Sequence, residues 1–167
     1  MTPIFRLTFL FFIFCCHSYG QGAMPQIKGK WGQVATLLQE RSSIITDLAK
    51  ELSTSKVDKK QNGNLKALAI DLQNYLGSLK ELDSVSVGIA AAKNSKLLQT
   101  INATLIEIDN HEEIKSKQRF ATIQAKLEGC ENSIKNASRE YNDVCREYHR
   151  TDLVLILDYP KATEVRY

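Results

Sequence analysis

Proline is nearly missing from the body of this sequence. The three prolines are Pro3, Pro25 and Pro160, so none interrupts the long region between the last two. Because proline inside a helix costs about 3 kcal/mol, its absence favours long helices. No segment of useful length alternates apolar and polar residues, which is the pattern of a half-buried strand. We therefore expect an all-α fold.

Motifs for catalysis and cofactor binding are also lacking. The sequence contains no H-E-x-x-H, C-x-x-C, G-x-G-x-x-G or P-loop pattern. After the first twenty residues only two histidines remain, His111 and His149, and they lie far apart in the chain. Because catalysis requires converging polar groups, we predict that the protein is not an enzyme. We expect no catalytic residue, no cofactor and no metal site.

A strong excess of charge of either sign is absent. The chain has 22 Lys and Arg against 19 Asp and Glu, and removing residues 1–20 takes away Arg6 alone, which leaves 21 against 19, or +2. Nucleic-acid binding normally requires a basic footprint. The near balance therefore argues against a nucleic-acid partner.

The N-terminal segment carries almost no charge but is rich in apolar residues. Arg6 is the single charged residue before Lys28, and an apolar run extends from Leu7 to Cys16. This run is about half the roughly 20 residues that a membrane-spanning helix needs. It matches the hydrophobic part of a signal peptide, with a cut before Gln21. Two alternatives stay open: an uncleaved short anchor, and a lipoprotein that carries its lipid on one of two cysteines, Cys15 or Cys16.

Two further cysteines, Cys130 and Cys145, lie in what the pattern indicates is one helix. At about 1.5 Å of rise per residue they are roughly 22 Å apart, too far for a disulfide within one chain. We expect free thiols that pack as small core residues. Bridging between two chains is the alternative.

Apolar residues recur at alternating spacings of three and four, which is the pattern of long helices that bury one stripe. The most regular stripe predicts one helix over residues 120–148 and consists of Phe120, Ile123, Leu127, Cys130, Ile134, Ala137, Tyr141, Val144 and Tyr148. A second stripe predicts a helix over residues 31–52 and consists of Trp31, Val34, Leu38, Arg41, Ile45, Leu48 and Leu52.

Two more helices are predicted between these. The polar stretch 57–63 ends in Asn-Gly, a turn signal, so we expect the second helix to begin after Asn64 as its cap. We interpret residues 84–88 as the next turn and expect a third helix from near Ile89 to near Asp109. Short turns between four helices predict an antiparallel up-down four-helix bundle. The expected organisation is a leader in residues 1–20 (signal peptide or short membrane anchor), the bundle in 21–152 and a C-terminal tail in 153–167.

Arg41 is unexpected in an apolar stripe, because a buried guanidinium is costly without a carboxylate partner. If the first and last helices are antiparallel, the middle of one faces the middle of the other. Glu128, Glu131 and Asn132 lie near that level. We predict a structural polar pair between Arg41 and Glu131 or Glu128 that sets the register of the two helices. Two other interpretations remain: a buried ligand site around the pair, and an Arg41 side chain that reaches solvent.

Two segments resemble the LemA family. Residues 120–134, F-A-T-I-Q-A-K-L-E-G-C-E-N-S-I, are similar to the family block F-x-x-L-Q-x-x-L-E-G-T-E-N-x-I, and residues 140–148 continue it with E-Y-N-D-V-C-R-E-Y. Residues 31–48 are similar to W-x-Q-V-x-x-x-L-Q-x-R-x-x-L-I-x-x-L. The positions that match family motifs are Trp31, Gln33, Arg41, Leu127, Glu128, Gly129, Glu131, Asn132, Tyr141 and Asn142.

The resemblance implies a bacterial, extracytoplasmic helical bundle, periplasmic or membrane-associated, and supplies no reaction. We predict an exported, non-enzymatic cell-envelope protein that binds another envelope protein or itself through helix faces. An exposed apolar strip would support this, and its candidates are Leu37, Ile44, Leu97 and Ile106. The alternatives are a membrane-tethered or membrane-shaping scaffold held by the N-terminal segment, and a ligand binder with a deep core pocket at Arg41 and Glu131.

Overall fold

The computed structural model describes residues 4–55 and 57–157, with side chains from Gly22 onward. The chain forms α1 (Ile4–Leu52), α2 (Lys59–Ser78), α3 (Ser84–Ile108), α4 (Glu112–Lys115), α5 (Gln118–Glu147) and the short 3-10 helix η1 (Thr151–Leu153). No strand occurs within the described residues, and the all-α prediction is confirmed. The leader's side chains and tail residues 158–167 lie outside the part that is described.

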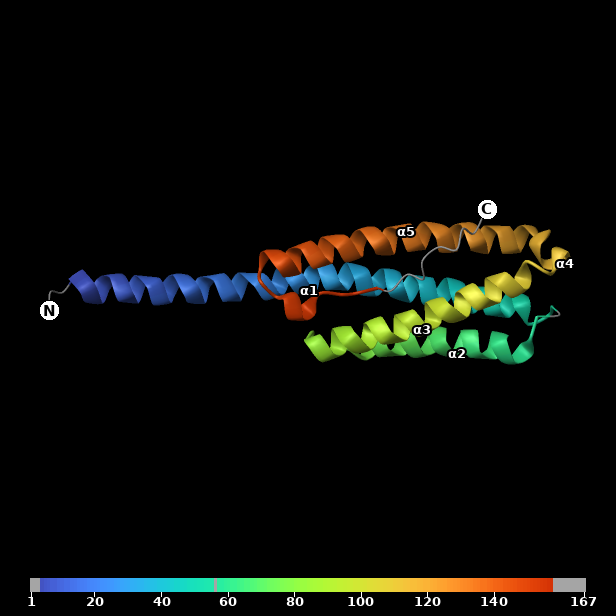
Figure 1. Ribbon diagram of the computed structural model, residues 1–167, viewed down its shortest axis with the longest axis horizontal. Coiled ribbons are helices and arrows are strands. Elements are labelled where there is room, and N and C mark those ends of the chain that lie inside the picture. The colour runs from blue at the N-terminus through green and yellow to red at the C-terminus, as the bar shows by residue number, and fades with distance from the viewer. Residues whose placement is uncertain (1–3, 56, 158–167) are drawn as a thin grey trace.

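The four long helices alternate in direction along the chain (Figure 1). Helix α1 packs against both α2 and α5, and α2 packs against α3. The short helix α4 connects α3 to α5 at one end, while η1 contacts both α3 and α5 near the other. The order around the molecule is therefore α5, α1, α2, α3, with η1 between the two outer helices. Helix α1 continues past the other helices toward the N-terminus (Figure 1).

The stripe predicted for the first helix is confirmed. Its seven members, Arg41 included, are all buried. The helix itself is longer than expected, because Pro25 lies inside α1 rather than ahead of it. Burial of Ala23 and Ile27 extends the apolar stripe across Pro25, and packing on both sides offsets the backbone hydrogen bond that proline removes.

The stripe predicted for the last helix is correct in its first half and drifts in its second. The helix bounds, Gln118–Glu147, match the predicted 120–148 within two residues. After Ile134 the buried positions are Ser138, Tyr141 and Cys145, while Ala137 and Val144 are only partly buried. A straight α-helix has 3.6 residues per turn, so a strict seven-residue repeat drifts around it. The shift brings a serine hydroxyl and a thiol into the core.

The start predicted for the second helix is wrong. Helix α2 begins at Lys59, and the Asp58 carboxylate accepts a hydrogen bond from the Lys60 backbone N–H at 2.8 Å. Asn62 and Gly63 therefore lie inside α2 instead of forming a turn. The Asn62 side chain donates to the Ala49 carbonyl at 2.9 Å, which ties α2 to α1. This contact between distant segments offsets the roughly 1 kcal/mol that glycine costs a helix.

The second predicted turn is also displaced. Helix α3 begins at Ser84 rather than near Ile89, and the turn occupies residues 79–83. Asp83 and Ser86 form a capping box, in which the Ser86 N–H donates to Asp83 Oδ1 at 2.7 Å and the Asp83 N–H donates to Ser86 Oγ at 2.9 Å. Two satisfied N–H groups at the helix start outweigh the weak helix preference of the nearby valines. The predicted end near Asp109 is confirmed, since α3 ends at Ile108.

Replacing Asp83 with alanine is expected to destabilise the protein at neutral pH and to have less effect in acid. The Ser86 backbone N–H and hydroxyl hold the pKa of Asp83 below its ordinary value. A lowered pKa in the folded state stabilises the fold above about pH 4, and this contribution is lost as the pH falls through the folded pKa. Thermal melts of both proteins at pH 7 and pH 2.5 test this. An equal difference in melting temperature at both pH values would contradict it.

Candidate functional site

Arg41 lies in the C-terminal half of α1 and has no exposed surface. Its Nη1 donates to Glu131 Oε1 on α5 at 3.0 Å, and its Nη2 donates to the side-chain oxygen of Asn94 on α3. Asn94 is also fully buried, whereas the Glu131 side chain keeps 20% of its surface exposed. The Arg41 cluster, defined as Arg41, Asn94 and Glu131, thus joins three helices at one level of the structure.

Of the three residues predicted to lie near Arg41, one contacts its side chain and two do not. Glu131 contacts Arg41, whereas Glu128 and Asn132 are exposed on α5. Asn94 was missed. It lies four residues before Leu98 on the apolar stripe of α3, so its polar side chain at a buried position was a signal that the sequence contained.

Several polar atoms of the Arg41 cluster have no hydrogen-bond partner within the described structure. Arg41 Nε, Asn94 Nδ2 and Glu131 Oε2 are buried without a hydrogen-bond partner within the described structure, and each such atom costs about 1–3 kcal/mol. The nearby Cys130 thiol donates to the Leu37 carbonyl at 3.5 Å, and burial raises its pKa to about 11. A protonated thiol is a poor nucleophile, so the cluster offers ion pairing and hydrogen bonding.

Both described cysteines are free and buried. Burial also raises the pKa of Cys145 above its ordinary value. In a chain with Cys15→Ser and Cys16→Ser, we expect both thiols to react slowly with Ellman's reagent at neutral pH and rapidly in denaturant, because the thiolate is the reactive form. Stopped-flow absorbance measures both rates. Equal rates in the two conditions would contradict the burial.

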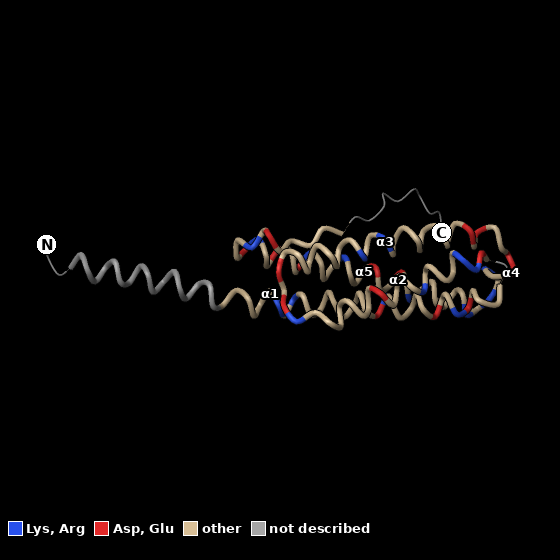
Figure 2. The backbone as a smooth tube through the Cα atoms, turned by 90° about the horizontal axis from the view of Figure 1, so that it is seen from below, with Lys and Arg blue, Asp and Glu red and all other residues tan. Residues whose placement is uncertain are grey.

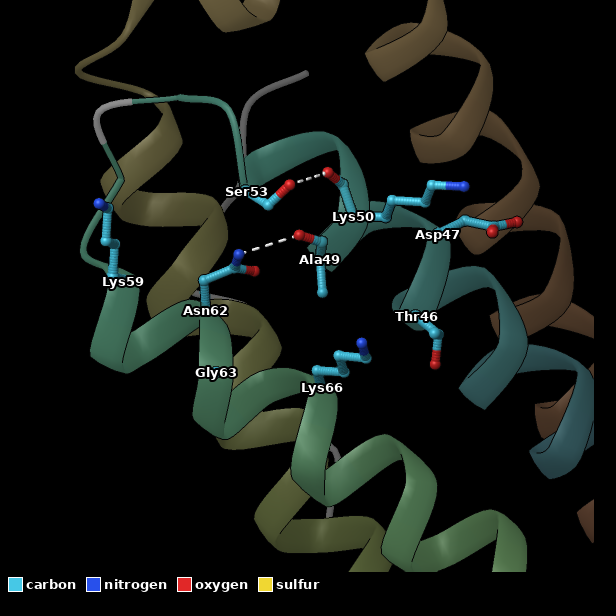
Figure 3. Close-up of a pocket in the computed structure, with 9 residues that line it drawn as sticks. All are labelled: Thr46, Asp47, Ala49, Lys50, Ser53, Lys59, Asn62, Gly63 and Lys66. Carbon is cyan, nitrogen blue, oxygen red and sulfur yellow. Dashed lines mark hydrogen bonds between the residues drawn. The ribbon is translucent and has the colours of Figure 1, made fainter.

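One open pocket lies further along α1, between its C-terminal end and the start of α2 (Figure 3). Its volume is about 490 Å³, and its lining includes three lysines, Lys50, Lys59 and Lys66. Lys66 extends from α2 toward α1, whereas Asp47 points away from the space (Figure 3). No member of the Arg41 cluster lines it, so it differs from the deep core pocket that ligand binding at Arg41 and Glu131 requires.

A second polar arrangement joins α5 to the C-terminal tail. The Tyr141 hydroxyl donates to the Leu153 carbonyl at 2.7 Å. The Asn142 amide donates to the Leu155 carbonyl and accepts from the Leu155 N–H, both at 2.8 Å. Trp31 packs against Tyr141, with ring centroids 5.4 Å apart. We call Tyr141 and Asn142 the tail clamp; its contacts with the tail were not predicted.

The residues singled out as motif positions occupy several different places in the structure. Arg41 and Glu131 belong to the Arg41 cluster. Tyr141 and Asn142 form the tail clamp, and Trp31 packs against Tyr141. Leu127 is a core residue. The exposed positions are Gln33, Glu128, Gly129 and Asn132.

A metal site and a membrane-spanning helix are both absent from the part of the chain that the structure describes. In that part of the chain, no group of three or more His, Cys, Asp or Glu side chains is arranged to hold a metal ion. Likewise, no helix within these residues combines the length and apolar character needed to cross a membrane.

Comparison with known proteins identifies the family. The family model described as the LemA family matches residues 30–153, a span that includes the Arg41 cluster, the tail clamp and η1. No curated protein matches the sequence. Because the family model covers well over half of the chain, this protein belongs to the LemA family.

Proposed function

We propose that this protein is a non-enzymatic, extracytoplasmic four-helix bundle of the LemA type that binds another envelope protein, or a second copy of itself, through the outward face of α3. The observation that carries this proposal is the exposure of apolar side chains toward the two ends of that face, with exposed Lys96 and Gln99 between them. Val85 and Ile106 are 66% and 65% exposed, and Ile89 is 39% exposed. Exposed apolar patches mark interaction sites more often than isolated apolar residues do.

The residues around these side chains favour close contact. Gly88, Ala92 and Ala103 are exposed on α3, and small side chains let a partner approach the helix backbone. Between Asp83 and Glu107 the charged residues are Lys93 and Lys96 alone. Lys93 pairs with Asp71 on α2. Helix α3 is therefore much less charged than an ordinary surface helix.

The apolar strip expected from the sequence is only partly correct. Ile106 is exposed, but Leu97 is fully buried. Leu37 and Ile44 are half-buried and pack against the core. The proposed surface, which we call the α3 face, consists of Val85, Gly88, Ile89, Ala92, Ala103 and Ile106.

The charge distribution supports a protein partner over a nucleic acid. Positions of Lys and Arg are interspersed with positions of Asp and Glu over the described helices (Figure 2). Binding to the phosphate backbone requires clustered basic side chains. The apolar leader of the sequence supports export from the cytoplasm.

The experiment is affinity purification of the tagged full-length protein from its own cell envelope. We expect the variant Val85→Lys with Ile89→Lys to lose a partner that the wild-type protein retains. The matched control is Ile70→Lys, which alters an isoleucine that is 38% exposed on α2, outside the α3 face. Sedimentation of the purified proteins tests for a second copy. Identical partners and masses for all three proteins would refute the α3 face.

A membrane-tethered scaffold is the second candidate, and one observation favours it. Helix α1 runs from Ile4 to Leu52 without interruption, so a retained leader would couple the bundle to the membrane through continuous helix. Mass spectrometry of the mature N-terminus separates the two candidates. A chain that begins at Gln21 argues against the tether, whereas an intact or lipidated leader supports it.

A further inference from the structure

Helix α3 carries two stripes of helical spacing on opposite sides. One stripe faces the core and includes Asn94, Leu97 and Ile101. The other, which we call the outer stripe, is exposed within the described structure, and its members follow one another at alternating spacings of four and three: Val85, Ile89, Ala92, Lys96, Gln99, Ala103 and Ile106. This spacing is the a/d repeat of a coiled coil, in which a helix buries such a stripe against a partner helix. The outer stripe therefore has the form of a helix–helix contact surface.

The outer stripe reads nearly the same from either end. Isoleucine, alanine and a long polar residue follow one another from Ile89 to Lys96, and the same order runs backwards from Ile106 to Gln99. Two antiparallel copies aligned about the middle of this span therefore match each kind of side chain with its own kind. The matched layers, each formed twice, are Ile89 with the partner's Ile106, Ala92 with the partner's Ala103, and Lys96 with the partner's Gln99.

Charge favours this antiparallel alignment over a parallel one. A parallel pair places Lys96 against Lys96 of the partner subunit in the middle of the contact, where like charges repel. The antiparallel pair instead places the Lys96 ammonium beside the partner's Gln99, whose side-chain oxygen can accept a hydrogen bond from it. Two charged residues flank the outer stripe on one edge, Lys93 and Glu107. In the antiparallel alignment they lie opposite two hydroxyl residues, the partner's Thr100 and the partner's Ser86, so no like charges are opposed.

We propose that two copies of this protein associate through the outer stripe of α3 as a two-fold symmetric, antiparallel helix pair. This rests on the proposed function and specifies its partner as a second copy of the chain. Both copies use the same patch, so the assembly closes as a dimer. Because α1 extends past the other helices at one end (Figure 1), the two N-terminal segments of the dimer point in opposite directions. The dimer therefore fits chains whose leader has been removed, and it excludes two chains anchored side by side in one membrane.

Disulfide cross-linking of full-length chains tests the partner and the orientation together. In the Cys15→Ser, Cys16→Ser background, Ala92→Cys and Ala103→Cys each add one exposed thiol, and one of the two chains carries a mass tag. An oxidised mixture of the two variants should form the tagged–untagged disulfide dimer, because these positions face each other across the antiparallel pair. Either variant alone should cross-link far less. Ala67→Cys, at an exposed alanine on α2, replaces Ala103→Cys in the control mixture. Equal cross-linking in the two mixtures, or efficient cross-linking of each variant alone, overturns the proposal.

A charge placed at position 99 tests the central layer. Gln99→Glu sets a carboxylate beside the partner's Lys96 twice in each dimer, and it should lower the dissociation constant of the dimer about fivefold. Gln99→Lys opposes like charges at the same place and should raise that constant by about the same factor. Gln73 is exposed on α2, so Gln73→Glu and Gln73→Lys are matched controls that should leave the constant unchanged. Sedimentation equilibrium of the full-length proteins measures all five. A monomeric wild-type chain, or equal effects at positions 73 and 99, overturns self-association.

Failure of self-association and failure of the α3 face give different results. If the wild-type chain is monomeric but affinity purification still recovers a partner that the variant Val85→Lys with Ile89→Lys loses, the α3 face binds a different protein and the antiparallel dimer is wrong. If the wild-type chain is monomeric and no partner distinguishes the variant, both the dimer and the α3 face are wrong.

Discussion

Replacing Glu131 with methionine is expected to lower the free energy of unfolding by about 3–5 kcal/mol, because it leaves a buried guanidinium without its carboxylate. Arg41 has no exposed surface, so water cannot replace the lost partner without rearrangement of the core. Replacing Arg41 with methionine should cost less, about 1–3 kcal/mol, since the Glu131 side chain is 20% exposed and can recover hydration. Urea denaturation followed by circular dichroism measures both changes.

The double variant Arg41→Met with Glu131→Met provides the control. Removing both charges together leaves only the Asn94 amide without its partner, so the double variant should be more stable than Glu131→Met alone. Strictly additive effects would show that the two charges do not depend on each other in solution. A larger loss from Arg41→Met than from Glu131→Met would contradict the expected cost of leaving the guanidinium unpaired.

Replacing Tyr141 with alanine should lower the free energy of unfolding by about 3–5 kcal/mol, as expected for a large buried aromatic side chain. The side chain is fully buried, packs on Trp31 and holds the tail through Leu153. Tyr141→Phe is the matched control, because it keeps the ring and removes one hydrogen bond, for a cost of about 1 kcal/mol. Trp31 is the one tryptophan in the chain, so its fluorescence reports unfolding directly. Similar losses in the two variants would contradict the packing role of the ring.

Long-range periodicity made the fold class predictable. The stripes of α1 and α5 each place apolar residues at helical spacing, and a single charged residue, Arg41, stands out against them. The level at which two antiparallel helices meet follows from their midpoints, which is how Glu131 entered the set of expected partners. The contact between two helices could therefore be predicted from the sequence where each helix carried a regular apolar stripe.

The turns were less predictable because local signals compete there. Asn62-Gly63 is a strong turn signal, yet Asn62 bonds to Ala49 in α1 and stays helical. The roles of Asn94 and of the tail clamp were not predicted from the sequence, for a related reason. Their roles depend on residues distant in sequence. The position of Asn94 on the stripe of α3 indicates its burial but not its pairing with Arg41, and no periodic pattern indicates the pairing of Asn142 with Leu155.

The antiparallel pairing of α1 with α5 underlies the Arg41 cluster and the tail clamp, and spin-label distances test it most directly. Lys30 pairs with Glu140 at 2.6 Å, whereas Arg119 lies near the other end of α5 and pairs with Glu51. In the Cys15→Ser, Cys16→Ser background, labels at positions 30 and 140 should lie close together. The distance between labels at positions 30 and 119 should be roughly 30 Å longer than the distance between positions 30 and 140. A longer distance between positions 30 and 140 than between 30 and 119 would mean parallel helices and would contradict the structure described above.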